Sequence, residues 1–416
     1  MKHIYTSVDI GSDSIKVITC ELYHNKLNLL AASSIESKGI KKGLIVNVEE
    51  AALSLRKALQ EIESMLGISI RKVLASIPSY FAEFKMVQGS ISLKGENGEP
   101  YSTVTGNEIV KVMQNAIQKE SFSNNEMVTM LPIDFTLDEK EGIKDPKGLV
   151  GKDLFVRGVL VTVPKKNVYS VVGLIEGLGI EVVDISVNGI NDYYAFKKEG
   201  TEEGLGAIIN VGSETTTVSI YNKGILVKNS IIQMGGKNID NDLAYMYKVP
   251  TSSAKKMKEK FALAHKMYAQ VNDYYEIDSS DGETIRVNQY EVSEVVMSRL
   301  EEILSLAKKE IQILTNKPVH YIMLTGGVSN FFNFNLIASE IFGKDVIIDS
   351  VKLVGIRDNR YSVALGNIIY FMSKLKLKGK DYTMFTRTDE ENLGTVKKNV
   401  SDESMLGKVF GYFFND

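Results

Sequence analysis

The sequence predicts an α/β fold of two similar lobes, because one motif occurs twice among alternating strand and helix patterns. Residues 8–22 read VDIGSDSIKVITCEL, and residues 209–221 read INVGSETTTVSIY. Each copy is an apolar strand, a glycine turn edged with hydroxyl side chains and a second alternating strand, the pattern of a β-hairpin. If the two turns face each other, their backbone N–H groups can converge on one anion. The space between the lobes is therefore the predicted site.

The composition of the chain excludes several classes of function. Its 416 residues are 44% hydrophobic and 24% charged, and the net charge of -3 gives no electrostatic reason to bind nucleic acid. The single cysteine, Cys20, excludes an internal disulfide and is expected to pack as a small apolar side chain. The four histidines lack the spacing of a zinc site. Without a signal peptide or a run of about 18 apolar residues, we expect a cytoplasmic protein.

The first lobe continues after its hairpin with a strand, a helix and a further strand. These are residues 26–34, residues 48–66 with apolar side chains at helical spacing, and residues 73–77. We predict a lobe core over residues 1–81. It is completed from later in the chain by residues 155–195, with a strand at 157–163, a helix at 168–178 and a strand at 182–187, and by residues 345–378.

An inserted subdomain interrupts this lobe. Between residue 84 and about residue 154 the chain holds strand-like segments, a glycine-rich turn at 95–98, a helix near 107–119 and a polar stretch at 138–152. We predict that the insertion covers residues 82–154.

The second hairpin opens the second lobe, with a predicted core at residues 196–235 and 300–344 and a smaller subdomain at 236–299. Residues 231–247 are predicted as a strand, a glycine pair and a helix. Two further helices are predicted, a lysine-bearing one at 252–264 and a long one at 292–314. The apolar strand 321–324 ends in Thr325, Gly326 and Gly327. A third glycine turn therefore lies at the carboxyl end of a strand, where the ligands of α/β sheets bind.

The C-terminal region changes character twice. Residues 379–403 alternate charged and small polar side chains, which cannot bury a core, and predict a flexible linker. In residues 404–416, one helical face gathers the apolar side chains Met405, Leu406, Val409, Phe410 and Phe413. So short a helix needs a surface, either a membrane or the body of its own protein. The polar linker and the concentrated aromatic residues favour the membrane.

The glycine turns predict a phosphate site with a hydrated magnesium ion. Gly11 allows the backbone of Ser12 to approach a phosphate without a Cβ clash, and Lys16 on the returning strand can add a positive charge. Asp9, just before the turn, can hold Mg²⁺ through its waters. One such hairpin can be an ordinary tight turn. Three glycine turns at strand ends favour a binding site, and the absence of a Walker sequence favours a site between two lobes.

These residues resemble the actin, Hsp70 and sugar-kinase ATPase superfamily. Asp9, Gly11 and Lys16 are similar to its first phosphate motif, residues 210–216 to its second and residues 324–328 to its adenosine motif. Within the superfamily, the chain resembles the FtsA family of bacterial cell-division proteins over nearly its whole length. Residues 131–151, LPIDFTLDEKEGIKDPKGLVG, are similar to the stretch that closes that family's inserted subdomain. The terminal apolar segment is similar to its membrane-targeting helix.

The resemblance implies an actin-like two-lobe ATPase fold with an FtsA-type inserted subdomain and a C-terminal amphipathic helix. It implies ATP and Mg²⁺ between the lobes, and filaments on the cytoplasmic face of the cell membrane at the division site. The expected partners are the C-terminal tail of FtsZ, further copies of the chain, membrane lipids and later division proteins. Arg299 would contact the FtsZ tail, and Asp9 the metal. The implied nucleotide contacts are Asp9, Gly11, Ser12, Lys16, Gly212, Ser213, Thr215, Thr216, Gly235, Gly236, Lys258, Gly326, Gly327 and Val328.

The second phosphate motif departs from the superfamily pattern. Asn210 stands where an aspartate is usual, and Ser213 and Glu214 replace glycines. Asn210 lacks the charge that helps to hold Mg²⁺, while Glu214 brings a negative charge near a polyphosphate unless it points away. Lys255 also replaces an acidic residue that usually precedes the lysine at Lys258. We expect a nucleotide-binding scaffold with weak hydrolysis rather than a fast enzyme.

Two other classes of function remain open. A PilM-like pilus assembly ATPase would share the inserted subdomain, but the terminal amphipathic segment argues against it. A metabolite kinase of the same superfamily would need a catalytic carboxylate beside a sugar or acid pocket. Lipid binding by the C-terminal segment separates both classes from the membrane tether.

Overall fold

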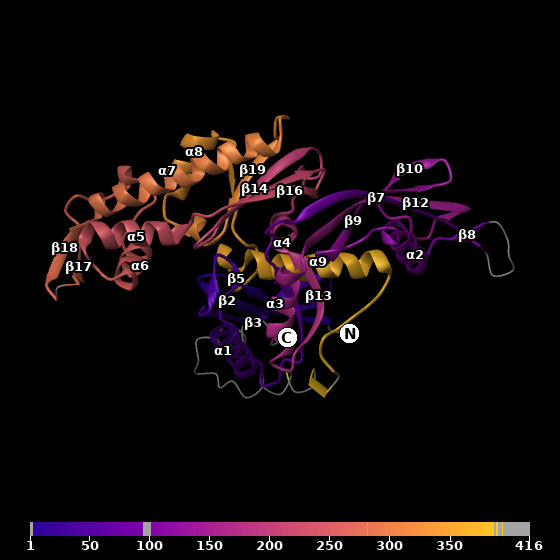
Figure 1. Cartoon of the computed structure of the whole chain (residues 1–416), viewed down its shortest axis with the longest axis horizontal. Helices are drawn as coiled ribbons and strands as arrows, with labels where there is room; N and C mark the ends of the chain where they lie inside the picture. The colour runs from indigo at the N-terminus through magenta and orange to yellow at the C-terminus, as the bar shows by residue number, and fades with distance from the viewer. Residues whose placement is uncertain (1–2, 95–100, 281, 387, 390–392, 394–416) are drawn as a thin grey trace, which may run out of the picture.

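The computed structural model describes residues 3–94, 101–280, 282–386, 388–389 and 393. Two five-stranded sheets form the cores of two lobes, and a four-stranded sheet forms a subdomain beside the first lobe (Figure 1). The first sheet contains β1 (His3–Ile10), β2 (Ser14–Tyr23), β3 (Lys26–Glu36), β6 (Lys72–Ile77) and β13 (Glu181–Val187), in the spatial order β13-β6-β1-β2-β3. The second contains β14 (Leu205–Val211), β15 (Thr216–Asn222), β16 (Ile225–Ile232), β19 (Tyr321–Thr325) and β20 (Ile347–Ile348), in the order β16-β15-β14-β19-β20.

The two lobe sheets have the same topology. In each, three consecutive strands form an antiparallel meander, and two strands from later in the chain add in parallel beside the first of the three. β1 therefore corresponds to β14, and β2 to β15. The predicted twin hairpins are confirmed, and the similarity extends from the hairpins to the whole sheets.

The helices of the first lobe include one whose bounds the sequence predicts residue for residue. α1 (Val48–Leu66) begins where the Asn47 side chain accepts two backbone N–H groups and ends at Gly67, whose φ of 69° suits glycine. α3 (Lys165–Glu176), α4 (Asn188–Phe196) and α9 (Ser362–Lys378) complete the lobe. α4 and α9 touch at Gly366, where a Cβ would lie 1.7 Å from the carbonyl oxygen of Asn191. Figure 1 shows α9, in yellow, crossing between the two lobes.

The second lobe packs its helices on one sheet face around a separate core. Its helices are α5 (Gly236–Tyr247), α6 (Thr251–Lys260), α7 (Gln289–Leu314) and α8 (Phe334–Phe342), and a hairpin of β17 (Tyr274–Asp278) and β18 (Thr284–Asn288) lies at its end. The long helix predicted at 292–314 is confirmed as α7. Its apolar side is buried in the lobe core through Val292, Val296, Leu300, Ile303, Leu304, Ala307 and Ile311.

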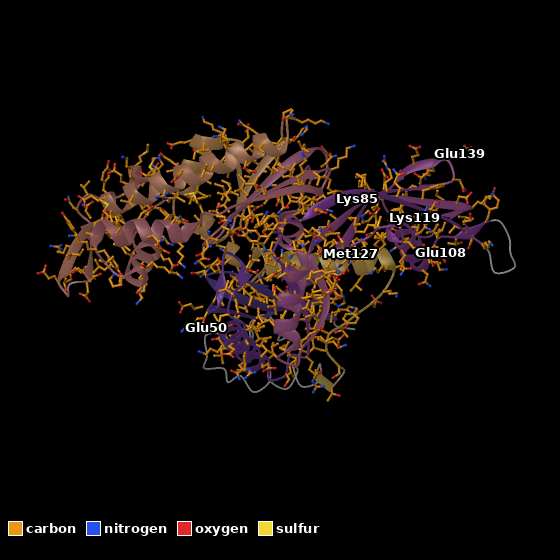
Figure 2. The ribbon with its side chains drawn as sticks, viewed as in Figure 1. Glu50, Lys85, Glu108, Lys119, Met127 and Glu139 are labelled. Carbon is orange, nitrogen blue, oxygen red and sulfur yellow. The ribbon has the colours of Figure 1, made fainter. Side chains whose placement is uncertain are left out.

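The inserted subdomain is a sheet with one helix and its own hydrophobic core. The sheet has the order β10-β9-β12-β7, and a two-stranded sheet lies beside it. The elements are β7 (Glu83–Ser92), β8 (Ser102–Thr103), α2 (Gly106–Ile117), β9 (Asn125–Leu137), β10 (Lys140–Ile143), β11 (Val150–Gly151) and β12 (Asp153–Pro164). Charged side chains such as Lys85, Glu108 and Glu139 cover its surface (Figure 2).

One predicted boundary is wrong, because β12 belongs to the inserted subdomain. Its pairing with β7 continues as far as Thr162 opposite Glu83, so the predicted boundary at residue 154 falls inside a strand. The strand predicted at 157–163 is real, but it joins this sheet rather than the sheet of the first lobe. Val161 and Val163 nevertheless pack into the first-lobe core. A pattern of alternating residues indicates a strand without indicating its partner strand.

The segment after α9 also differs from the prediction, because it packs on the first lobe. The N–H of Met384 donates to the carbonyl oxygen of Ile4 at 3.0 Å, and the side chains of Met384 and Phe385 are buried. The prediction of a flexible linker is therefore wrong for residues 379–386, where a few apolar side chains among polar ones suffice for docking. The predicted helix 404–416, with its five apolar residues, lies outside the described residues. Among the helices that the structure describes, none could cross a membrane.

Candidate functional site

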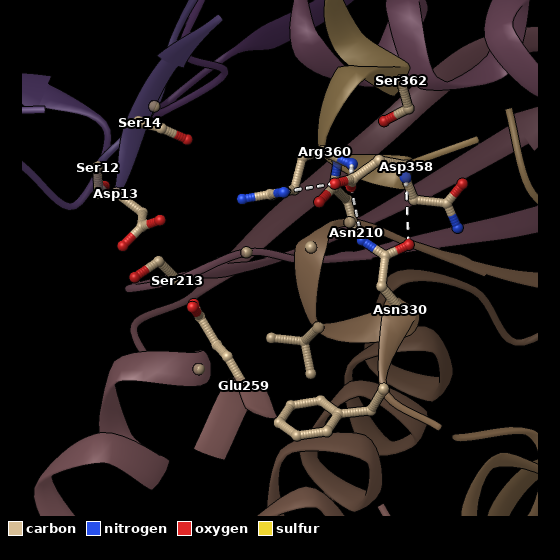
Figure 3. Close-up of a pocket in the computed structure, with 18 of the residues that line it drawn as sticks. Ser12, Asp13, Ser14, Asn210, Ser213, Glu259, Asn330, Asp358, Arg360 and Ser362 are labelled. Carbon is tan, nitrogen blue, oxygen red and sulfur yellow. Dashed lines mark hydrogen bonds and ion pairs between the residues drawn. The ribbon is translucent and has the colours of Figure 1, made fainter. Parts of the chain in front are cut away.

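A cavity of about 580 Å³ lies between the lobes and is lined by all three predicted glycine turns. Its size is that of a small-molecule site. Figure 3 shows Ser12, Asp13 and Ser213 on one side of it, with Asp358 and Arg360 on the other.

The turn between β1 and β2 brings a buried ion pair to the cavity wall. The N–H of Gly11 donates to the carbonyl oxygen of Ser14 at 3.2 Å, which closes the turn. The strand register sets Asp9 opposite Lys16, and the Lys16 Nζ lies 3.2 Å from an Asp9 carboxylate oxygen. Ser76 donates to the other Asp9 oxygen at 3.1 Å. The buried hydroxyl of Ser14 has no hydrogen-bond partner among the described residues, so it is available to a ligand.

The turn between β14 and β15 has the same backbone. The N–H of Gly212 donates to the carbonyl oxygen of Thr215 at 2.9 Å, and Asn210 takes the place of Asp9. The expectation that the Thr216 side chain faces the cavity is wrong, because its hydroxyl donates to Met234 within the lobe. Successive side chains of a strand point to opposite faces, so Thr215 and Thr217 line the cavity instead.

Beneath the second turn lies a carboxylate that the sequence did not predict. Asp192 of α4 is 2% exposed. The Asn210 amide group donates to both of its oxygens, at 3.0 and 2.8 Å, and Ser362 donates to one of them at 3.0 Å. Burial raises the pKa of Asp192 from its ordinary 3.8 to about 7, although the two donors oppose this change; the charge of Asp9 adds to it.

The acidic residue of each turn reaches across to the opposite lobe. Asp13 pairs with Lys255 on α6 of the second lobe. Glu214, at the same place in the second turn, accepts the N–H of Lys42 from the first lobe at 2.5 Å. Glu214 also pairs with Lys237 at 2.6 Å, so its charge is directed away from the cavity. Burial opposes the ionisation of Glu214, but the bonds from Lys237 and Lys42 outweigh it and lower the pKa of this carboxyl.

A short hairpin of the first lobe joins the two turns. It consists of β4 (Ile40–Lys41) and β5 (Leu44–Ile45), with Lys42 and Gly43 at its tip. The Gly43 N–H donates to the Ser12 hydroxyl at 2.7 Å, next to the bond from Lys42 to Glu214. The Lys42 Nζ donates to Gln233 of the second lobe at 2.6 Å. The tip therefore closes this end of the cavity through contacts with both lobes.

The third turn needs glycine for steric reasons. Gly326 has a φ of +94°, and a Cβ on it would lie 2.4 Å from the carbonyl oxygen of Val211. A Cβ on Gly235 would lie 2.5 Å from the carbonyl oxygen of Gly212. Gly235 thus supports the second turn and does not line the cavity, whereas Gly236 does.

Charged groups on the far wall were missed by sequence reasoning, apart from Lys258. Lys258 is buried, pairs with Asp240 at 2.7 Å and donates to the carbonyl oxygen of Gly236 at 3.1 Å. Arg360 lies in the 3₁₀ turn Asn359–Tyr361, and its guanidinium forms an ion pair with Asp358 at 2.6 Å. Glu259 points into the cavity from the second lobe (Figure 3). These residues carry no motif, and only the tertiary fold brings them together.

Most of the predicted nucleotide contacts lie together on the cavity wall. Those that line it are Asp9, Gly11, Ser12, Lys16, Gly212, Ser213, Thr215, Gly236, Lys258, Gly326, Gly327 and Val328. Arg299 lies on α7 and does not line it; its guanidinium binds both carboxylate oxygens of Asp242, at 2.6 and 2.9 Å. Among the described residues, no group of three or more His, Cys, Asp or Glu side chains could hold a metal ion.

Comparison with solved structures defines the fold class. The PilM–PilN type IV pilus biogenesis complex matches with a TM-score of 0.59 at 13% identity, over 88% of this chain and 98% of that one. MreB5 of Spiroplasma citri bound to ADP matches with a TM-score of 0.53 at 14% identity, over 90% and 98%. Together with the two lobes of equal topology, these matches define an actin-like fold. At these identities they show the fold alone.

Sequence comparison then identifies the family. The profile described as "Cell division protein FtsA" matches residues 207–366, and that described as "SHS2 domain inserted in FTSA" matches residues 83–162. Cell division protein FtsA of Bacillus subtilis is 28% identical, over 91% of this chain and 85% of the relative. The protein of the same name from Enterococcus hirae is 25% identical over 99% and 98%. The chain belongs to the FtsA family of cell division proteins.

Proposed function

We propose that the chain binds Mg²⁺ and ATP in the interlobe cavity and tethers FtsZ to the membrane during cell division. The observation that carries the nucleotide proposal is the convergence of three glycine turns on one cavity. Two polar atoms on its wall, the Ser14 hydroxyl and the Asn188 side-chain carbonyl, are buried without a hydrogen-bond partner among the described residues, and they fit a ligand that donates and accepts hydrogen bonds.

The phosphates would lie at the paired turns. The backbone at Gly11 and Ser12 faces them from one lobe, and the backbone at Gly212 and Ser213 from the other. Lys16 supplies a positive charge, and its pairing with Asp9 keeps that charge compensated when the cavity is empty of phosphate. Asp9 would hold the hydrated Mg²⁺, which screens phosphate charge when bound. Gly236, Gly326, Gly327, Val328 and Lys258 would surround the nucleoside.

The proposal is tested by titrating the full chain with a fluorescent ATP analogue, with and without Mg²⁺. We expect saturable binding that requires Mg²⁺ and competes with unlabelled ATP. Failure to bind under both conditions would remove the nucleotide proposal. Hydrolysis should be slow because Asn210 replaces a carboxylate; multiple turnover at about 1 to 10 per second would contradict the scaffold role.

Membrane attachment is assigned to the C-terminal segment. Met405, Leu406, Val409, Phe410 and Phe413 provide a short apolar face with little positive charge, so one copy should bind lipid weakly. Polymerisation on the membrane would add many weak anchors. Co-sedimentation with liposomes compares the full chain with a chain that ends at Glu403. Equal pelleting would contradict the tether and favour a PilM-like or metabolite-kinase role. Filaments on lipid monolayers that need ATP, seen by electron microscopy, would support polymerisation.

Contact with the FtsZ tail is proposed at Arg299. Its guanidinium is shared between Asp242 and Glu302, so an acidic peptide has to compete with these carboxylates. We expect Arg299→Glu to abolish binding of an FtsZ C-terminal peptide and Asp242→Asn to strengthen it, as measured by fluorescence anisotropy. Undiminished affinity of Arg299→Glu would remove Arg299 from the interface.

A further inference from the structure

The negative charge that Asn210 lacks is carried by Asp192, the side chain to which Asn210 donates. Asn210 replaces the usual aspartate of the superfamily pattern, and its amide group donates to both oxygens of Asp192. Asp192 comes from α4, a different element, so the local sequence of the turn does not reveal it. The Asp192 carboxylate is thus in direct contact with Asn210, the residue that stands in place of an aspartate.

The contact with Asp192 fixes which way the Asn210 amide group points. A carboxylate accepts hydrogen bonds, so the NH₂ group of Asn210 must face Asp192. The side-chain oxygen of Asn210 is then on the other edge of the amide, beside Gly326, where a Cβ would lie 2.5 Å from it. Asn210 lines the cavity at this place. The second turn therefore presents an acceptor oxygen rather than a donor.

The charge of Asp192 is not needed for these hydrogen bonds. A neutral side chain with one carbonyl oxygen could also accept from Asn210 and from Ser362. Burying a carboxylate at 2% exposure with no cation paired to it in the described structure costs free energy. Asp9 of the facing turn is close enough to act on Asp192 electrostatically. Asp192, which has no ion-pair partner among the described residues, therefore lies near Asp9, whose charge is paired with Lys16.

We propose that Asp192 is a positioning residue for a hydrated divalent cation at the phosphate end of the cavity, acting through Asn210. Asp192 orients the Asn210 oxygen toward the waters of the cation and supplies the negative charge that Asn210 lacks. Together with Asp9, it restores a pair of carboxylates around the cation. This inference rests on the proposed binding of Mg²⁺ and ATP.

Relocating the charge tests the inference. Asp192→Asn removes the carboxylate with little change of shape, and the double variant Asp192→Asn with Asn210→Asp returns it to the turn. Ser362→Ala is the matched control, because it removes a hydrogen bond to Asp192 and no charge. For each, the affinity for a fluorescent ATP analogue is measured across a Mg²⁺ titration and in EDTA.

We expect Asp192→Asn to raise the Mg²⁺ concentration for half-maximal nucleotide binding about tenfold, because a full charge is lost near the cation. The double variant should restore it, and affinity in EDTA should change little. An unchanged Mg²⁺ requirement in Asp192→Asn, or a double variant no better than the single one, would overturn the inference. Absence of nucleotide binding by the unaltered chain would instead overturn the proposed function.

Discussion

The glycine turns of the two lobe hairpins have the same backbone but distribute their charges differently. In the first turn, the Asp9 carboxylate lies in the strand beside the cavity and is paired with Lys16 at 3.2 Å. In the second, the corresponding Asn210 is neutral, and the carboxylate to which it donates, Asp192, belongs to helix α4. The acidic residues two places after each glycine, Asp13 and Glu214, both point to the opposite lobe. The turn geometry is thus kept while its charges are moved.

This difference shows that the geometry of the turns and the charges near them are set by different residues. Each turn closes with a hydrogen bond from the N–H of its glycine to the third residue after it, at 3.2 and 2.9 Å, and strand pairing on either side fixes that bond. Charge can be supplied from any element that reaches the same point. The duplicated backbone therefore does not imply a duplicated function, and substitutions at equivalent positions should have unequal effects.

The largest effect is expected at Asp9. Asp9→Ala leaves Lys16 nearly buried without its counter-ion, because the two side chains are 7% and 11% exposed. Breaking such a pair costs about 3 to 5 kcal/mol. Asp13→Asn, in the same turn but with its side chain 30% exposed, should cost less than about 1 kcal/mol. Urea unfolding of each full-length variant measures the difference. Equal losses in the free energy of unfolding would show that the Asp9–Lys16 pair stabilises the fold no more than the Asp13–Lys255 pair does.

A second prediction concerns pH, because the buried carboxyl of Asp192, on α4 beneath the second turn, is protonated more readily than an exposed one. Its pKa of about 7 in the folded chain lies above the ordinary 3.8. The folded state therefore holds an extra proton between these values, so the stability from this group is present at low pH and is lost as pH rises through 7. Asp192→Asn should remove this dependence and stabilise the ligand-free chain at pH 8 by roughly 2 to 4 kcal/mol.

Thermal unfolding at pH 5 and pH 8 measures this effect. The facing groups are Asp9 of β1, which strengthens the pKa shift, and Asn210 and Ser362, which oppose it. Glu50→Gln, an exposed change on α1, should leave the pH dependence as it is. A variant Asp192→Asn that loses stability at pH 8 would mean that the carboxylate is held ionised and paired.

A third prediction compares two glycines at the second turn. A Cβ on Gly235 meets the backbone oxygens of Gly212 and Ser213 at 2.5 and 2.6 Å, whereas a Cβ on Gly212 meets only the oxygen of Thr215, at 3.0 Å. Gly235→Ala should therefore cost about 2 kcal/mol in the free energy of unfolding, and Gly212→Ala less than half of that. Similar losses for both would mean that the turn adjusts freely.

The sequence predicted those features that depend on neighbouring residues. Both hairpins and α1 were predicted well, because alternation, glycine turns and the spacing of apolar side chains are local signals. The partner sheet of β12 and the docking of residues 379–386 were mispredicted, because both depend on contacts between distant segments.

The same division holds within the site. The glycine turns were visible in the sequence, but Asp192, Arg360 and Thr217 were not predicted. A signal for Asp192 did exist, since it lies between Ile190 and Tyr193, which are buried on the same short helix. An acidic residue on a buried helical face needs a partner, but sequence alone does not name Asn210 as that partner.

The smallest effect is expected at the bonds by which each turn holds the opposite lobe. Glu214→Gln weakens the bond to the Lys42 N–H and the ion pair with Lys237, whose Nζ end is half exposed, so the loss should be about 1 kcal/mol. The substitution should affect local opening of the hairpin tip at residues 40–45 more than the global free energy of unfolding. Hydrogen exchange of the 40–45 hairpin tip should become faster, and a bound nucleotide analogue should dissociate faster.

Asp13→Asn provides the matched test, because it breaks the mirror-image bond to Lys255. If both bonds restrain the same opening of the cavity, the double variant should change nucleotide release by more or less than the sum of the single free-energy changes. Strict additivity would mean that each bond restrains only its own loop. The two turns would then have the same backbone geometry but would move independently. Closure of the cavity would have to depend on other contacts between the lobes, such as the bond from Asn229 to the Ser79 carbonyl oxygen at 3.1 Å.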